Sequence, residues 1–290
     1  MTPKCILLAL LALAFFPSNL CAQTSQSNST TLRSVIRQGS NTTYFALVRM
    51  LLPDLQFDSD DSNSATAHRT IPIKHIADNE AESLKGDFAV TAFGARWLMS
   101  NGRKILLLHL DLTADGANEG THYEGEATLL GAFSVDPTPK VLDVMDIKTD
   151  RFTDFWEAQP VFQLNSQNEA FVVYSSHFNA GESYNDLQLL FLDGERFNVI
   201  TNIFLLNTQG CGATFNETPY FRAAVDGRKY PRIIVSVKVK KEPDAKECSR
   251  KTPGYTKSYQ GVFYWRPSKG KYQTNSPQLS ALDRFNRERL

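Results

Sequence analysis

Apolar and polar positions recur along this chain in a repeated pattern. Three comparable apolar runs, Ile105–Asp111, Phe171–Ser176 and Ile233–Lys238, begin at residues 105, 171 and 233. Each run follows a short aromatic segment and a polar turn, and precedes a polar stretch, a second apolar run and a tight turn. Self-similarity at a nearly constant spacing indicates a repeated supersecondary unit.

Within each unit the apolar runs are short and separated by turn residues, which predicts strands. The expected strands are 88–99, 105–112, 127–135 and 141–147 in the first unit; 160–164, 170–176, 187–192 and 197–206 in the second; and 219–224, 232–240, 259–265 and 272 onward in the third. Asn-Gly, Asp-Gly and Lys-Gly pairs between the runs are hairpin signals. Each unit is therefore predicted to be a four-stranded antiparallel meander.

The predicted fold class is all-β, with three meanders in tandem over residues of about 85–150, 151–210 and 211–280. Tandem meanders resemble the blades of a β-propeller, a resemblance of architecture that names no family. Closed rings typically contain about four to eight blades, so three would be incomplete. The N-terminal region could supply a partial blade, the sheets could form an open sandwich, or a homo-oligomer could complete the ring.

The N-terminus has the order of a secretory signal peptide, with Lys4, an apolar run at 5–16 and a cleavage site after Ala22. Leu20 stands where a lipoprotein signal needs a small residue, which disfavours a lipid anchor on Cys21. We therefore expect an exported, secreted or periplasmic protein without a transmembrane segment. Residues 23–31 are predicted to be a polar linker.

Residues 32–84 are predicted to form a small mixed region before the β domain of 85–290. Leu32, Val35 and Ile36 suggest a helical face, and 42–48 is predicted to be a strand. Composition predicts a loop at 54–68, and 71–76 alternates like an edge strand that contains Pro72. At the other end, helical spacing of apolar residues in 278–290 predicts a short helix that covers the last sheet edge.

Composition excludes some partners. The chain carries 31 basic and 31 acidic residues and has no basic block, which argues against nucleic acid. No cofactor motif, zinc spacing or catalytic elbow is present. Cys211 and Cys248, which remain after removal of the leader, are predicted to form a disulfide in an oxidising compartment.

The predicted meanders place long connections at one end of the sheets and short turns at the other. Both cysteines fall at the long-loop end, and polar and aromatic residues collect there. The candidate ligand-binding residues are Asp111, Asp115, His122, Glu124, Trp156, Glu157, His177, Glu182 and Asp186. Carboxylates with aromatic rings are typical of carbohydrate and small polar ligand sites. For any one of these residues, an ordinary solvated loop position is the competing interpretation.

Two further signals in the sequence are weaker. His109 and Asp111 share one face of a strand, as a metal or acid–base pair would, but a buried core histidine is favoured because the run is apolar. Asp58, Asp60 and Asp61 lack the glycine and the distal glutamate of a calcium loop. No metal site is predicted.

Two functions remain open at this point. The first is an exported binding or scaffold module that holds a glycan, peptide or protein partner at the long-loop face. The second is a secreted hydrolase that acts on carbohydrate through loop carboxylates. No nucleophile or metal motif occurs in the sequence, which favours the binding module.

Overall fold

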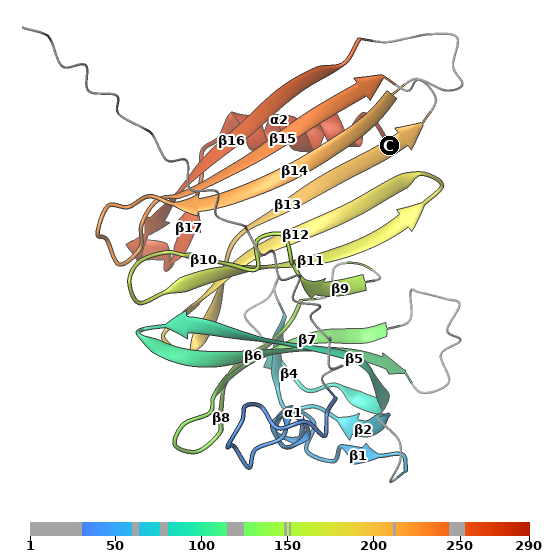
Figure 1. Ribbon diagram of the computed structural model, residues 1–290, viewed down its shortest axis with the longest axis vertical. Helices are drawn as coiled ribbons and strands as arrows, with labels where there is room; N and C mark the ends of the chain where they lie inside the picture. Colours follow the sequence, from blue (N-terminus) through green and yellow to red (C-terminus); the bar gives the residue numbers. More distant parts are fainter. Residues whose placement is uncertain are drawn as a thin grey trace, which may run out of the picture. The chain divides into compact units, whose positions relative to one another are not determined.

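The computed structural model describes residues 31–59, 64–75, 81–114, 125–147, 150, 152–210, 213–243 and 253–290. Contacts divide the chain after Thr31, and every described helix and strand belongs to the unit Leu32–Leu290. This unit is mostly β, as predicted, and its described strands form two open sheets (Figure 1). Neither described helix is long and apolar enough to cross a bilayer.

The first sheet has eight strands among the described residues, in the order β1-β2-β5-β6-β7-β8-β3-β4. The strands are β1 (Gln56–Phe57), β2 (Ala65–Arg69), β3 (Ile73–His75), β4 (Ala81–Glu82), β5 (Lys85–Ser100), β6 (Arg103–Ala114), β7 (Gly125–Ser134) and β8 (Lys140–Asp146). β5 to β8 form the antiparallel order expected for the first unit, whereas β3 pairs with β8 in parallel.

The second sheet contains nine described strands. They are β9 (Phe152–Phe155), β10 (Val161–Gln163), β11 (Glu169–Asn179), β12 (Glu182–Asp193), β13 (Arg196–Gly210), β14 (Ala213–Ala223), β15 (Ile233–Pro243), β16 (Tyr255–Arg266) and β17 (Lys271–Gln273). Strands β10 to β17 follow one another in sequence order, and β9 pairs with the same strand, β11, as β10 does. A 3-10 turn (Pro267–Lys269) separates β16 from β17.

The interpretation of three propeller-like blades is not confirmed. Thr208, Gln209 and Gly210 of β13 pair with β14, so the second and third predicted units belong to one sheet. The predicted loop at 177–185 is also wrong, because β11 and β12 continue to a two-residue turn. Ala180 and Gly181 have positive φ angles of 45° and 96°, which suit a tight hairpin. His177, Glu182 and Asp186 therefore lie in strands.

The N-terminal region differs from the prediction in several places. Residues 42–48 do not form a strand, since α1 spans Tyr44–Leu51 and Thr43 caps it by accepting a bond from Ala46 N. The predicted helical face at 32–36 is irregular chain whose Leu32 and Ile36 are buried. β1 and β2 occupy parts of the predicted loop, and β3 lies between β8 and β4 instead of at an edge. Pro72 precedes β3 and so removes no bond from it.

Each sheet buries one face under a helix. α1 packs on the first sheet in a cluster that contains Leu47, Leu51, Leu106 and Phe133. The predicted C-terminal helix is present as α2 (Pro277–Arg287), and it lies across β13 and β16 instead of covering the sheet edge.

A third cluster joins the two sheets. Leu107 and Leu130 of the first sheet pack in it with Phe155, Phe171 and Leu190 of the second. Successive residues of one strand therefore pack in different clusters, one under a helix and one between the sheets, because successive side chains of a strand point to opposite faces.

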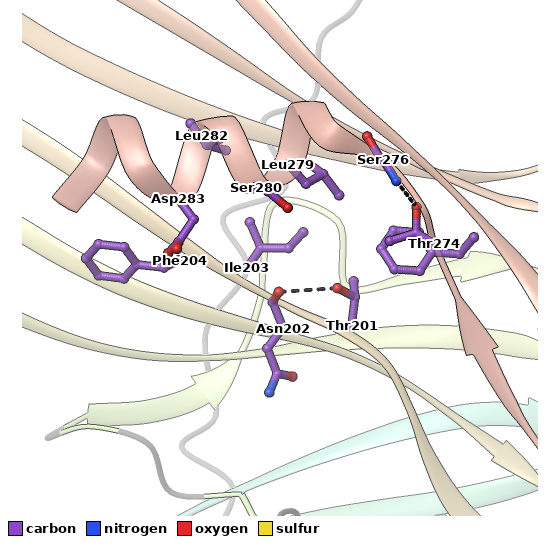
Figure 2. Close-up of a pocket in the computed structure, with 11 residues that line it drawn as sticks. Thr201, Asn202, Ile203, Phe204, Thr274, Ser276, Leu279, Ser280, Leu282 and Asp283 are labelled. Carbon is purple, nitrogen blue, oxygen red and sulfur yellow. Dashed lines mark hydrogen bonds between the residues drawn. The ribbon is translucent and has the colours of Figure 1, made fainter. Parts of the chain in front are cut away.

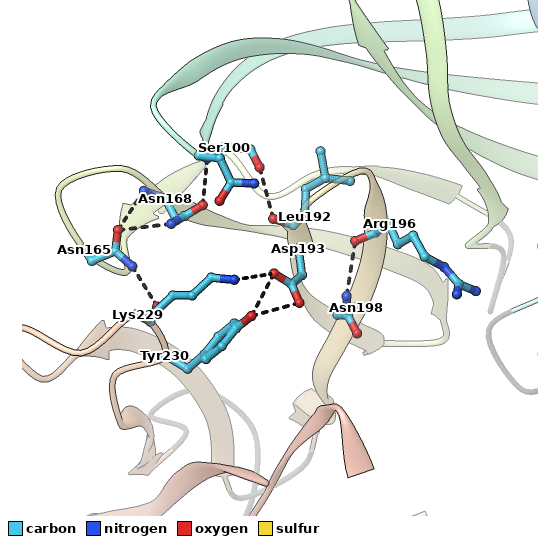
Figure 3. A network of polar contacts seen from close by, with 10 residues as sticks. Ser100, Asn165, Asn168, Leu192, Asp193, Arg196, Asn198, Lys229 and Tyr230 are labelled. Carbon is cyan, nitrogen blue, oxygen red and sulfur yellow. Dashed lines mark hydrogen bonds and ion pairs between the residues drawn. The ribbon is translucent and has the colours of Figure 1, made fainter. Parts of the chain in front are cut away.

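The short turns at one end of the sheets are tied together by hydrogen bonds (Figure 3). Asn101 N donates to Asn168 Oδ1 at 2.9 Å, and Asn165 Nδ2 donates to Lys229 O at 2.8 Å. Tyr230 Oη donates to Asp193 Oδ1 at 2.9 Å. These contacts link the first turns of the three predicted units, and the bond between Asn101 and Asn168 joins the two sheets at this end.

Candidate functional site

Six of the nine predicted ligand-binding residues lie among the described residues. Asp115, His122 and Glu124 lie outside them, as do Cys211 and Cys248, so the predicted disulfide stays a prediction. The six described residues are Asp111, Trp156, Glu157, His177, Glu182 and Asp186. Three of these, His177, Glu182 and Asp186, come together on the hairpin of β11 and β12.

His177 is the centre of this group. Its Nδ1 contacts Asp150 Oδ2, and its ring stacks on Tyr184 with centroids 4.2 Å apart and planes 10° apart. In the register of β11 and β12, Tyr184 is opposite His177 and Asp186 is opposite Ser175. Tyr184 and Asp186 are two residues apart, so their side chains lie on the same face of β12. Tyr184 Oη donates to Glu182. We call Asp150, His177, Glu182, Tyr184 and Asp186 the acid–imidazole cluster.

The cluster is partly shielded from water, and the pKa values of Asp186 and Tyr184 are raised. The side chains of His177 and Asp150 are 26% and 18% exposed. Burial raises the pKa of Asp186, the Asp150 carboxylate raises it further, and His177 opposes the rise. The hydrogen bond to Glu182 raises the pKa of Tyr184, because it favours the phenol over the phenolate.

A second polar group lies on the first sheet. His109 is buried, and its Nε2 lies 3.3 Å from Asp111 Oδ1. Thr128 Oγ1 donates to the same carboxylate oxygen at 2.8 Å. His109 and Asp111 therefore lie beside each other, and His109 occupies the buried position that the apolar run favoured.

Hydrogen bonds run across the sheets from the His109–Asp111 group to Gln188 of β12, beside the acid–imidazole cluster. Gln188 Nε2 donates to Ile147 O at 3.2 Å, and Ile147 N donates to Thr128 O at 2.9 Å. Gln188 follows Asp186 on the same face of β12. Polar atoms therefore continue between the sheets from Asp111 to the acid–imidazole cluster. We call this the polar layer.

Several buried atoms in and beside the polar layer have no hydrogen-bond partner within the described part of the chain. They are His109 Nδ1, Thr113 Oγ1 and Gln188 Oε1. Buried polar atoms without partners are uncommon, because each costs about 1–3 kcal/mol. Such atoms are places where a ligand atom or ordered water would be stabilised.

Trp156 and Glu157 do not join this group. Trp156 packs edge-on against Tyr174, with ring centroids 5.4 Å apart, in the core beneath α2. Glu157 is largely exposed and forms an ion pair with Arg96 of β5. These two residues are structural in the positions described, because one fills a core and the other bridges the sheets.

A cleft of about 280 Å³ lies between β13 and α2 (Figure 2). Ile203, Leu279 and Leu282 supply apolar wall, while Asn202 and Ser280 add polar groups. Sequence reasoning missed this cleft, although the polar residues that flank the C-terminal apolar positions could have drawn attention to it. It lies away from the predicted residues.

The described residues contain no group of three or more His, Cys, Asp or Glu side chains arranged to hold a metal ion. No protein-family model, curated protein or solved structure matches this chain. The site must therefore be interpreted from its own geometry.

Proposed function

We propose that this chain is a binding module whose ligand site is the acid–imidazole cluster at the end of the polar layer. The observation that carries the proposal is the convergence of Asp150, Tyr184 and Asp186 on His177. A folding core does not require two carboxylates around one imidazole. Holding them together costs desolvation, which is typical of functional sites.

The chemistry of the cluster favours an oligosaccharide as the ligand. Carboxylate oxygens accept hydrogen bonds from sugar hydroxyls, and aromatic side chains supply apolar area against sugar rings. Gln188 Oε1, a buried acceptor without a hydrogen-bond partner among the described residues, lies behind the cluster toward the first sheet. A peptide or protein partner with hydroxyl or amide donors uses the same groups.

The test is calorimetric titration of the protein with a panel of oligosaccharides, followed by variants. For any saccharide that binds, Asp186→Asn and His177→Gln are expected to weaken binding by roughly tenfold or more, because each removes a charge-assisted bond worth about 1.5–3 kcal/mol. Glu195→Gln is the matched control, since it removes one carboxylate charge from the turn that follows the opposite end of β12. Equal affinity of Asp186→Asn and the control would contradict the proposed site.

A carbohydrate hydrolase is the second candidate, and one observation favours it. The pKa of Asp186 is raised beside a second carboxylate, Asp150, and a general acid of a glycosidase needs such a neighbour. Incubation of the same panel with the wild-type protein, with products resolved by mass spectrometry, separates the two functions. Turnover that Asp186→Asn abolishes while binding persists would favour the hydrolase; binding without turnover would favour the module.

Export remains part of the proposal and depends on the sequence of residues 1–22 alone. Mass spectrometry of the protein recovered from outside the cytoplasm tests whether the chain is exported. A mature chain that begins at Gln23 is expected, and a full-length chain retained in the cytoplasm would contradict export.

A further inference from the structure

The second sheet leaves one side of β14, β15 and β16 exposed. Burial alternates over residues 216–223 of β14 and 233–240 of β15, so one face belongs to the core under α2 and the other faces solvent. In Figure 1 these strands lie side by side with α2 behind them. The exposed side carries Tyr220, Arg222, Lys238, Lys240, Tyr264 and Arg266, and we call it the basic face.

Charge on the basic face is mostly of one sign. Lys240 pairs with Glu242, whereas no ion pair of Arg222, Lys238 or Arg266 is found within the described part of the chain. The chain as a whole has a net charge of zero, so this local excess is not a consequence of a basic composition. Unpaired cations on a flat surface create a positive potential that attracts anionic partners.

The strand register arranges the other side chains of this face in rows. Thr218, Lys238 and Ser258 form one row across the three strands. Tyr220, Ser236 and Gln260 form the next row on the same face. Neighbouring strands lie about 4.8 Å apart, so donors repeat at short intervals across the sheet. Tyr220 and Tyr264 are 57% and 43% exposed, and each adds a ring to the polar rows.

We infer that the basic face binds an anionic polysaccharide, a sulfated or carboxylated chain laid across β14 to β16. The cations neutralise its acidic groups, the hydroxyl and amide side chains bond its hydroxyls, and the two tyrosines pack against its rings.

A membrane surface fits less well. Proteins that lie on membranes insert Trp, Phe or Leu side chains, whereas the apolar residues here are the half-buried Ile234 and Val262.

Heparin, a sulfated polysaccharide, is the probe. The wild-type protein is expected to be retained on immobilised heparin at low salt, and the triple variant Arg222→Gln, Lys238→Gln, Arg266→Gln is expected to bind roughly tenfold or more weakly, with a shallower dependence of affinity on salt. The control is Arg103→Gln, Lys104→Gln, Lys140→Gln, which removes the same charge from exposed positions on the first sheet. It should elute with the wild type.

Three results would overturn the inference. They are no retention of the wild-type protein, equal weakening in both triple variants, and tighter binding to phosphatidylglycerol vesicles than to heparin. Thermal unfolding of each variant shows whether a loss of binding reflects a loss of fold. The polysaccharide inference does not depend on the acid–imidazole cluster, so Asp186→Asn should leave heparin retention unchanged.

Discussion

At the residue scale, Asp186 links stability to the proposed function. Its pKa is raised in the fold, mainly by burial, so the folded chain keeps the proton to a higher pH than the unfolded chain. Folding stability therefore falls as the pH rises from the ordinary value of 3.8 through the raised pKa. At neutral pH the full cost of the buried charge is present.

Asp186→Asn is accordingly expected to raise the melting temperature at neutral pH, because it removes a partly desolvated charge beside Asp150. The difference from wild type should shrink toward about pH 3, where Asp186 is protonated in both states. Melting curves of both proteins across this range provide the measurement. A lower melting temperature of Asp186→Asn at neutral pH would show that the fold stabilises the Asp186 carboxylate, and this would contradict the raised pKa.

Burial raises the pKa of Glu217 as well, but Glu217 differs from Asp186 because its partner is the cation Arg289. Its side chain is fully buried, and it accepts bonds from Leu206 N, Asn286 Nδ2 and Arg289, which oppose the rise of its pKa caused by burial. The bond from Leu206 N satisfies a backbone group of β13 beyond the last residue pair with β14. The bonds from Asn286 and Arg289 anchor the end of α2.

Glu217→Gln should lower the free energy of unfolding by about 3–5 kcal/mol, because Arg289 would keep a buried charge without a counterion. Glu242→Gln is the control, since the Lys240–Glu242 pair is about half exposed and such pairs contribute about 0–1 kcal/mol. Urea denaturation of the two variants measures both values. Similar losses in the two would contradict the structural role of Glu217.

The residue types of the acid–imidazole cluster could be predicted from the sequence, but its membership could not. His177, Glu182 and Asp186 were found because carboxylates and histidine gather between two apolar runs. Asp150 lies 27 residues from His177 and meets it only because β9 returns along β11. Trp156 was misplaced for the same reason, since its neighbours are set by the fold and not by the chain around it.

At the element scale, strand positions followed from the alternation of apolar residues, while the connections between them did not. The 180–181 turn was missed because polar residues on both faces of the β11–β12 tip resemble a loop. α1 was missed because 42–48 is short and rich in β-formers, and its capping by Thr43 decided the structure. The joining of β13 to β14 was missed because Thr208, Gln209 and Gly210, which make the pairing, were assigned to a connection between units.

Glycines in the strands mark where each helix lies closest to its sheet. A Cβ added at Gly131 of β7 would meet Leu51 Cδ1 of α1 at 2.8 Å, and one at Gly261 of β16 would meet Leu279 Cδ1 of α2 at 2.4 Å. Glycine inside a strand often marks such a close approach. The absence of a side chain at these two glycines therefore allows each helix to pack closely on its sheet.

Gly261→Ala should destabilise the protein by about 1–3 kcal/mol, because the added methyl group overlaps Leu279. In the Leu279→Ala background the same change should cost less, since the overlapping atoms are gone. A double-mutant cycle measured by urea denaturation gives the coupling. Additive losses would mean that Gly261 acts through the strand backbone instead of through the contact with α2.

At the scale of the whole molecule, the cluster that joins the sheets predicts cooperative unfolding. Phe155 and Phe171 of the second sheet are buried among Leu107 and Leu130 of the first, and the hydrogen-bonded turns join the sheets at one end. Because each sheet needs the other to cover part of its apolar surface, neither should remain folded alone.

Phe171→Ala should therefore lower the stability of both sheets together, by about 3–5 kcal/mol. Trp97 of β5 reports on the first sheet and Trp265 of β16 on the second, so fluorescence of variants that lack Trp156 and keep only one of these two tryptophans follows each sheet separately. Coincident denaturation midpoints are expected in the parent, with equal shifts on Phe171→Ala. A midpoint that moves for Trp265 while that of Trp97 stays fixed would mean that the sheets are independent folding units, and that the polar layer between them can open without unfolding the chain.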